Sequence, residues 1–374
     1  MRLPAFASRG RGRAHRMFHP LCGATLDTLA PLLLKGGVAP GRAHVVAIAL
    51  AMATLRLPFT AAEAAACRLA RPRDAYPAPI FIIGHWRSGT THLTNVLSRS
   101  ASFGILSPMA VGLPAEALGL GRIAAPFIGQ FFPRTRLIDD IALAPDLPQE
   151  DELAMANLST LSCNHGIYFP QRLAHEFDRG VFGRGVPARE QGRWARRLER
   201  YVAKMTHAGG DRPLLIRNPA NSARIPALRA IWPRARFLHI HRHPAEVYAS
   251  SVRMFSTLVR ELSLGAAEAD TTALVRHVYP RLMCGLIDAG ATLPPGTHAE
   301  IRYERFLEEP GAELARVHDE LRLPGFAEAV GPMTRYLGSL RHTPRAHALN
   351  GDDAAWLAEH CAPVFSHWGY RSPQ

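Results

Sequence analysis

The sequence predicts an α/β fold in which a parallel β-sheet is flanked by helices on both faces and preceded by an N-terminal helical extension. Short apolar runs at residues 80–83, 214–216 and 236–240 are typical of buried parallel strands, and each is followed by a stretch with helical character. Residues 299–302 form a further candidate strand. Strands that alternate with helices in this way imply a parallel sheet covered on both sides.

The chain before the first strand has the composition of a basic lead followed by one or two helices. An Ala-rich stretch at 43–69 favours a helix, and a Pro-containing stretch at 72–79 ends this part of the chain. An earlier helix is indicated by four leucines: Leu26, Leu29, Leu32 and Leu33. We therefore expect a basic arm and helical extension over residues 1–75 and a second, catalytic domain over residues 76–374.

Within the second domain, the strand at 80–83 leads through a Gly-containing turn into a helix at 90–97. The long middle part, residues 98–210, is predicted to be helical. One helix there has a regular apolar face, which we interpret as core packing: Trp194, Leu198, Tyr201, Val202 and Met205.

Composition places the chain among globular proteins, because 47% of its 374 residues are hydrophobic and 20% are charged. The formal net charge of +13 raises nucleic acid, anionic lipid or an anionic small ligand as partners. Residues 1–79 hold ten Arg and one Lys against three acids, so much of the excess belongs to the N-terminal arm. A solvated arm is the simplest interpretation, and peripheral membrane contact through it stays open. No basic stripe with interleaved aromatics is present, so no nucleic-acid partner is expected.

Five cysteines are spread along the chain with no Cys-x-x-Cys pair, which argues against a disulfide framework or a zinc site and favours a reducing compartment. The longest apolar run, residues 45–55, is too short to span a bilayer. We therefore expect a cytoplasmic protein without a transmembrane span.

The turn after the first strand has the features of a phosphate-binding loop. It ends a strand and opens a helix, where free backbone N–H groups and the helix dipole favour an anion. Gly84 and Gly89 have the spacing of a Walker A loop, but Thr90 stands where a nucleotide triphosphatase needs lysine, and the cation has moved forward to Arg87. An arginine there can neutralise the oxygen between a 5′-phosphate and a sulfuryl group that is being transferred. The alternatives are a P-loop-type nucleotide triphosphatase or small-molecule kinase, or a structural Gly-rich turn.

The segment Pro-Ile-Phe-Ile-Ile-Gly-His-Trp-Arg-Ser-Gly-Thr-Thr-His-Leu at 79–93 resembles the 5′-phosphosulfate loop of sulfotransferases that use 3′-phosphoadenosine-5′-phosphosulfate (PAPS), in the bacterial branch of that family. The resemblance implies a P-loop-like parallel sheet, PAPS as co-substrate and no required metal. It assigns Arg87 as the catalytic cation and five residues as the phosphate cradle: Gly84, Ser88, Gly89, Thr90 and Thr91.

A second anion site is predicted where the strand at 236–240 leads into a helix that begins near Pro244. Arg242 and Ser250, eight residues apart, resemble the family's 3′-phosphate site. Tyr303 lies in a segment resembling the one whose tyrosine approaches the adenine. Each feature alone is more typical of ordinary structure, but two cradles in the family's order fit a nucleotide with a phosphate at each end.

The general base is the open part of the predicted site. Some relatives place a catalytic histidine in the segment that reads Arg217-Asn218-Pro219 here, and no histidine stands there. The resemblance lets Arg217 bind the sulfuryl oxygens. The acidic cluster at 150–152 resembles a helix start of the bacterial branch, so we expect Glu150 to be the base, with Glu152 and Asp139 as the other candidates, although acids are favoured in a first helical turn on structural grounds alone. The acceptor, a hydroxyl or amine on a carbohydrate, lipid or other compound, is not specified by the sequence.

Overall fold

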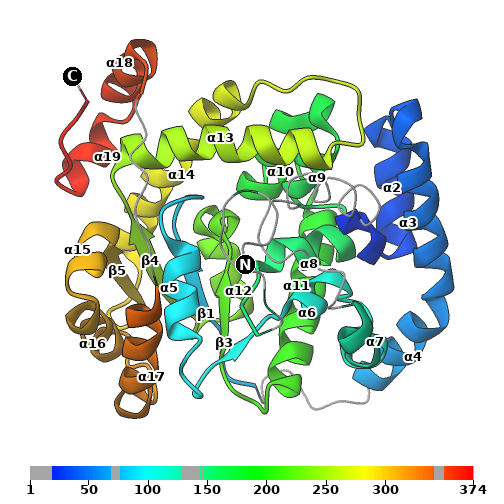
Figure 1. The fold of residues 1–374 in the computed structure, drawn as a ribbon, viewed down its shortest axis with the longest axis horizontal. Coiled ribbons are helices and arrows are strands. Elements are labelled where there is room, and N and C mark those ends of the chain that lie inside the picture. The colour runs from blue at the N-terminus through cyan, green and yellow to red at the C-terminus, as the bar shows by residue number, and fades with distance from the viewer. Residues whose placement is uncertain are drawn as a thin grey trace, which may run out of the picture.

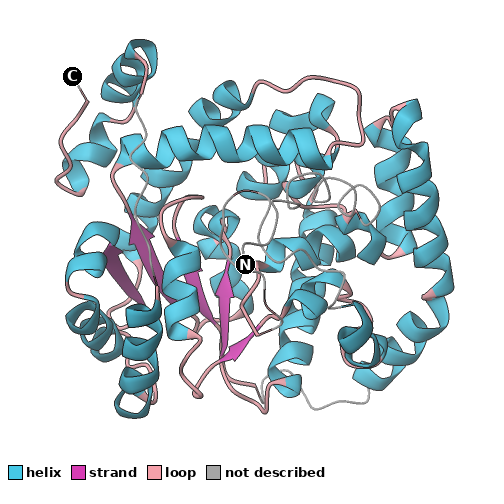
Figure 2. Cartoon of the chain, viewed as in Figure 1, coloured by secondary structure: helices cyan, strands magenta, loops and turns pink. Residues whose placement is uncertain are grey.

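The computed structural model describes residues 19–68, 76–128, 138, 144, 146–340 and 349–373. A five-stranded sheet with the order β2-β3-β1-β4-β5 lies within it, and all neighbouring strands are parallel (Figure 2). The strands are β1 (Ile80–Ile83), β2 (Gly104–Ile105), β3 (Leu214–Arg217), β4 (Arg236–His241) and β5 (His298–Arg302). The predicted α/β fold with a parallel sheet is confirmed. The short strand β2 falls in the middle part, which we expected to be helical. The sequence did not predict this strand, because two paired residues are too few to give a periodic signal.

Helices follow the strands as the alternation predicted (Figure 1). The helices next to the sheet and after it are α5 (Thr90–Leu97), α12 (Ile225–Ile231), α13 (Pro244–Leu262), α14 (Thr271–Thr292), α15 (Tyr303–Glu308), α16 (Pro310–Glu320), α17 (Phe326–Ser339), α18 (Gly351–His360) and α19 (Ala362–His367). Those of the middle part are α6 (Pro108–Gly112), α7 (Leu120–Ile128), α8 (Asp151–Leu158), α9 (Asn164–Tyr168), α10 (Leu173–Phe182) and α11 (Ala188–Ala208), and short 3₁₀ turns include η6 (Pro219–Ala223).

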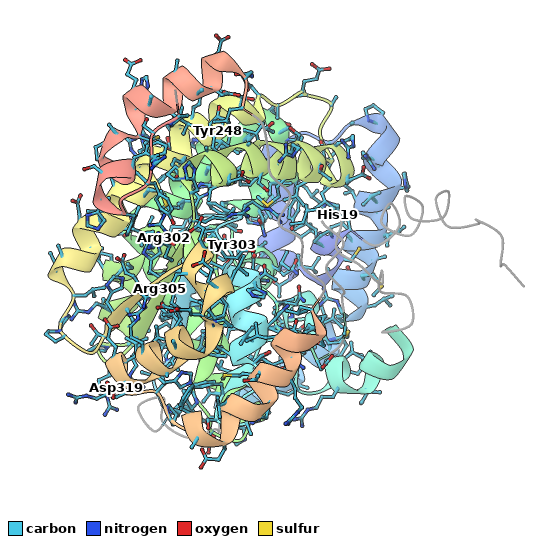
Figure 3. All side chains as sticks on the ribbon, turned by 60° about the vertical axis from the view of Figure 1, so that its left-hand side comes forward. His19, Tyr248, Arg302, Tyr303, Arg305 and Asp319 are labelled. Carbon is cyan, nitrogen blue, oxygen red and sulfur yellow. The ribbon has the colours of Figure 1, made fainter. Side chains whose placement is uncertain are left out.

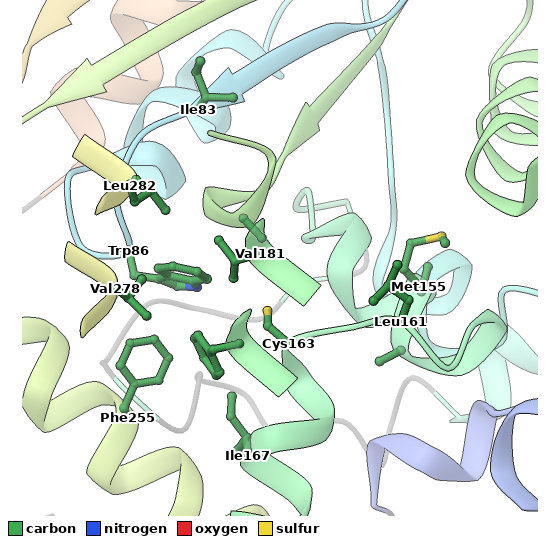
Figure 4. Packing of buried hydrophobic residues seen from close by; sticks show 14 of the residues in the cluster. Ile83, Trp86, Met155, Leu161, Cys163, Ile167, Val181, Phe255, Val278 and Leu282 are labelled. Carbon is green, nitrogen blue, oxygen red and sulfur yellow. The ribbon is translucent and has the colours of Figure 1, made fainter. Parts of the chain in front are cut away.

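Alternate side chains of the strands enter two separate cores, one on each face of the sheet. Phe81 and Ile83 of β1 belong to the larger core, part of which Figure 4 shows, whereas Ile80 and Ile82 belong to the smaller one. The smaller core is closed by α5, α16 and α17. Because both faces of β1 are fully buried, its apolar run is continuous rather than alternating.

The N-terminal part folds as α2 (Leu26–Gly36), α3 (Ala43–Leu55) and α4 (Leu57–Arg68), which lie together along one edge of the molecule (Figure 1). Leu29, Val45 and Ala53 are buried in the same large core that holds one face of the sheet. The apolar face expected on α11 is also buried there, from Trp194 to Met205. The helical extension therefore packs against the body that carries the predicted loop.

Candidate active site

The loop after β1 is held by hydrogen bonds to a residue that follows β3. Ser222 in η6 accepts a hydrogen bond from the backbone N–H of Gly84 at 2.9 Å and donates to the carbonyl oxygen of Gly84 at 3.1 Å. Three loop residues have positive φ, namely Gly84 at 140°, Arg87 at 72° and Gly89 at 108°. The loop is therefore a rigid turn with a backbone conformation that few sequences adopt.

The two glycines of the loop are required by close approaches as well as by φ. A Cβ atom on Gly84 would lie 2.3 Å from the carbonyl oxygen of Ile240 on β4, and a Cβ atom on Gly89 would lie 2.5 Å from the ring of Tyr303. The loop backbone passes close to β4 at Gly84 and close to the start of α15 at Gly89, so neither position has room for a side chain. This explains why glycines stand at the two positions that have the spacing of a Walker A loop.

The start of α5 has the properties of an anion site. Its N-cap residue, Gly89, supplies no side-chain cap, and the first turn contains no acidic residue. Ser88 is 1% exposed, and its Oγ atom has no hydrogen-bond partner among the described residues. A buried hydroxyl without a partner at the N-terminal end of a helix fits a phosphate or sulfuryl oxygen.

Arg87 connects the loop to the second predicted anion site. Its Nε atom donates a hydrogen bond to Oγ of Ser250 on α13 at 3.0 Å, although the two residues are 163 positions apart. Ser250 is buried. The two cradles that the sequence placed on separate elements are therefore adjacent.

Arg242 lies between β4 and α13, one residue before the N-cap His243. Its guanidinium stands 4.8 Å over the ring of Tyr303 and forms an ion pair with Glu246 at 3.4 Å. Tyr303, labelled in Figure 3, is the first residue of α15. Because Tyr303 also lies close to Gly89, its ring contacts both the loop and Arg242. Of the three predicted donor-side residues, Ser250 contacts Arg87 and Tyr303 lies against Gly89 of the loop, whereas Arg242 is next to the loop through the ring of Tyr303.

Arg217 and Glu150 form the link between the loop and the predicted base. Arg217, at the end of β3, donates a hydrogen bond from Nη1 to the hydroxyl of Thr91 in α5, and the same atom lies 3.5 Å from Oε1 of Glu150. Arg217 is buried, whereas the Glu150 side chain is 23% exposed at the N-cap of α8. An accessible carboxylate is thus held near the first turn of α5 by a buried cation.

Glu152 occupies a different environment, which the sequence did not reveal. Its carboxylate pairs with Arg224, which donates to Oε2 at 2.7 Å and to Oε1 at 3.2 Å, and it also accepts from Ser162 and Asn218. Burial favours the neutral acid, but the charge of Arg224 and these hydrogen bonds outweigh it and lower the pKa of Glu152 to about 2. Arg224 lies 72 residues from Glu152, so no local pattern could have indicated the pair.

Asp151, the remaining acid of the cluster, is buried between α8 and η6. Its Oδ2 atom accepts a hydrogen bond from Asn221 at 3.5 Å, and Oδ1 has no partner among the described residues. Desolvation and the neighbouring charge of Glu152 raise the pKa of Asp151 to about 7. The three consecutive acids therefore have three different environments, and of them Glu150 is the most accessible.

The third predicted acid and a possible metal-binding group remain to be placed. Asp139 lies outside the described residues. Among the residues that the structure describes, one group could hold a metal ion, formed by His239, His298 and Glu300 on β4 and β5. Its members already interact, since His239 Nδ1 and Glu300 Oε1 are 2.8 Å apart. The group belongs to the strands and not to the loop that carries Arg87.

Comparison with known proteins defines the class to which this fold and loop belong. The model of a family described as the sulfotransferase family matches residues 79–328, which include both cradles and the acidic cluster. The chain therefore belongs to the sulfotransferase family, as the loop resemblance predicted. The alternative of a nucleotide triphosphatase or kinase finds no support in these comparisons.

Two curated relatives of this chain are sulfotransferases whose names state an acceptor. The chain is 27% identical over 300 residues to the omega-hydroxy-beta-dihydromenaquinone-9 sulfotransferase Stf3 of Mycobacterium bovis and to the Stf3 of Mycobacterium tuberculosis, which covers 78% of this chain and 75% of each relative.

Solved structures confirm the fold. Sulfotransferase STF9 from Mycobacterium avium superposes with a TM-score of 0.71 at 15% identity, covering 99% of this chain and 100% of the other. STF1 from Mycobacterium tuberculosis gives a TM-score of 0.61 at 17% identity, covering 83% and 85% of the two chains.

Proposed function

We propose that this sulfotransferase transfers the sulfuryl group of PAPS to a hydroxyl group of an apolar lipid. The observation that carries the donor assignment is the 3.0 Å hydrogen bond between Arg87 and Ser250. It brings the end of the loop cradle to the helix that bears the second cradle, so one nucleotide with phosphates at both ends can occupy the two.

In this proposal the first turn of α5 and Ser88 hold the 5′-phosphosulfate, while Arg242 and Ser250 hold the 3′-phosphate. The supporting features are the uncapped helix start, the buried Ser88 hydroxyl and the position of Arg242 just before α13. Arginine suits both positions, because its planar guanidinium makes paired hydrogen bonds to phosphate and stays charged at all accessible pH values.

Transfer then proceeds in line. The acceptor oxygen forms a bond to sulfur while the bond from sulfur to the 5′-phosphate oxygen breaks, and the acceptor proton passes to Glu150. Arg87 stabilises the negative charge that develops on the leaving phosphate oxygen, and Arg217 binds the sulfuryl oxygens. We assign Glu150 as the base because its side chain is partly exposed and lies 3.5 Å from Arg217. We assign Glu152 a structural role, because both of its oxygens are already bound inside the protein.

The lipid acceptor is inferred from the relatives. Stf3, by its name, acts on a hydroxylated menaquinone derivative, and the chain matches it over three quarters of its length. We therefore propose the hydroxyl of a polyisoprenoid quinone or a similar apolar lipid as the acceptor class.

The donor assignment is tested by replacing Arg87 with Ala and with Lys and measuring transfer of labelled sulfuryl from PAPS to a hydroxylated quinone. Removal of one group that stabilises a developing oxyanion costs about 10²–10³-fold in kcat, so we expect a loss of that size for Arg87→Ala. Arg87→Lys should keep part of the rate. Arg260→Ala is the matched control, because Arg260 is an exposed arginine near the other end of α13. Near-normal turnover in Arg87→Ala, with an unchanged unfolding temperature, would contradict the assignment.

A further inference from the structure

The outward faces of the N-terminal helices and of α7 carry a concentration of exposed large hydrophobic side chains. Eight such side chains are exposed among the described residues, and only Leu307 and Val330 lie elsewhere. The other six form what we call the apolar band: Leu34 on α2, Leu50 and Leu55 on α3, Leu57 and Phe59 on α4, and Ile123 on α7, with Leu34, Leu55 and Ile123 at 88%, 70% and 70% exposure. Exposed apolar patches of this kind mark interaction sites on soluble proteins.

The surface of α3 and α4 around the band is nearly free of charge. Between residues 43 and 67 the only charged side chains of Asp, Glu, Lys or Arg type are Arg56 and Glu63, and both point into the protein. Arg56 pairs with Glu116 at 2.7 Å, and Glu63 pairs with Lys204 at 2.8 Å. The two charged side chains of α3 and α4 therefore form ion pairs with the rest of the protein, and the exposed surface of these helices is mainly apolar.

The same ion pairs decide how these helices can meet a bilayer. No single described helix is long and apolar enough to cross a membrane, although the pair Pro40–Leu55 and Leu57–Cys67, bent by 49°, meets that test by length and composition. Spanning would pull Arg56 and Glu63 from their partners and expose the buried face of α3, formed by Val45, Ala49 and Ala53. A bilayer can therefore contact the pair only from the side, as an interfacial helix does.

Exposed cationic side chains border the band on α2 and α7. Residues 19–128 contain three acids where the structure describes them, of which Glu63 and Glu116 are buried and Asp27 pairs with Arg197. Exposed cations of this region include Lys35 and Arg122. Apolar area bordered by cations complements a surface of anionic lipids.

We propose that the apolar band docks the protein on the surface of an anionic phospholipid bilayer, with α3 and α4 lying in the plane of the interface. The band occupies the edge of the molecule that α2, α3 and α4 form, away from the side where β5 and α15 to α17 lie (Figure 1). The sheet and the Arg87 loop are thus left free of the membrane contact. Docking needs neither donor nor acceptor, so this inference stands or fails independently of the proposed sulfuryl transfer.

The test is co-sedimentation of the full-length protein with vesicles of phosphatidylcholine alone and of phosphatidylcholine mixed with phosphatidylglycerol. We expect binding to the mixed vesicles that weakens as salt is added, because the cationic contribution is screened. The double variant Leu55→Glu/Phe59→Glu should lower the partition coefficient at least about tenfold, since inserting one such side chain is worth about that factor. The control Leu307→Glu/Val330→Glu, which changes exposed residues of α15 and α17, should bind as the unaltered protein does.

Thermal unfolding of both double variants checks that the fold is retained, as expected for exposed sites. Equal vesicle binding by the two double variants would overturn the proposal, as would a failure of the unaltered protein to bind either vesicle. Sedimentation velocity tests the alternative that a second copy of the chain covers the band. This alternative would be supported, and the proposal overturned, if the unaltered protein does not bind vesicles and forms a dimer that dissociates in Leu55→Glu/Phe59→Glu.

Discussion

Glu150 and Glu152 stand two residues apart in one acidic cluster, and the structure predicts opposite consequences for replacing them. Glu152→Gln keeps the shape of the side chain and removes its charge, which leaves Arg224 buried without a counter-ion. The two side chains are only 3% and 7% exposed, so little solvent can compensate. Breaking one side of a buried ion pair costs about 3–5 kcal/mol.

That cost can be converted into a change in unfolding temperature. At about 2.1 cal/mol/K per residue, the unfolding entropy of a 374-residue protein is about 0.8 kcal/mol/K. We therefore expect Glu152→Gln to lower the midpoint by about 4–6 °C in calorimetry. Transfer by the fraction that remains folded should stay close to normal. Glu150→Gln should show the reverse, with a smaller drop in the midpoint and a kcat lowered by about 10²–10⁴-fold, as for loss of a general base. The drop is smaller because the contact between Glu150 and Arg217 is longer, at 3.5 Å, and the Glu150 side chain is 23% exposed.

The double variant Glu152→Gln/Arg224→Met supplies an internal check, because removing both charges eliminates the unpaired cation. Its midpoint should exceed the value obtained by adding the effects of the two single variants, the mark of direct coupling. A Glu152→Gln protein with a normal midpoint and no transfer activity would refute the reasoning, since it would make Glu152 the base. Full activity in Glu150→Gln would refute the role assigned to that residue.

Three further outcomes follow from the site. Gly84→Ala should destabilise the fold by about 3 kcal/mol or more in chemical denaturation, because its φ of 140° and the carbonyl of Ile240 at 2.3 Å leave no room for Cβ, whereas Gly311→Ala, in open space, should not. Arg242→Ala should raise the KM for PAPS more than it lowers kcat in steady-state assays, because it removes binding common to ground and transition states. Asp151→Asn should gain stability over the unaltered protein on going from about pH 5 to about pH 8 in denaturation midpoints. Burial raises the pKa of Asp151 from 3.8 to about 7, so its protonated form stabilises the fold at low pH and this contribution is lost as the pH rises through about 7.

Local sequence patterns were sufficient for the main elements of the fold. Four of the five strands appear as short runs in the sequence, and the helices at 90–97 and around Trp194 to Met205 were predicted from a helix start and an apolar periodicity. The strand β2 was missed, because its two residues are defined by pairing with β3 and not by a pattern of their own. The division into residues 1–75 and 76–374 stays a prediction.

The geometry of the predicted donor side was readable from the sequence because its signals are local. A strand, a glycine-bounded loop and a helix start lie within 12 residues of one another, and the positive φ values at Gly84 and Gly89 follow from that geometry. The residues that support the loop from a distance had no such signal. Ser222 and Arg224 follow β3 by a few positions and reach partners 138 and 72 residues away.

By itself, the sequence determined which residue types stand at the strand-to-helix turns, and hence the family and the prediction of two anion cradles. Only the tertiary structure decided which charged side chains are buried in ion pairs and which stay accessible. It placed Arg87 against Ser250, gave Glu152 a buried partner in Arg224 and left Glu150 accessible beside Arg217. The physical reason is that backbone conformation is set mainly by near neighbours, whereas the state of a carboxylate depends on desolvation and on charges that folding brings from distant parts of the chain.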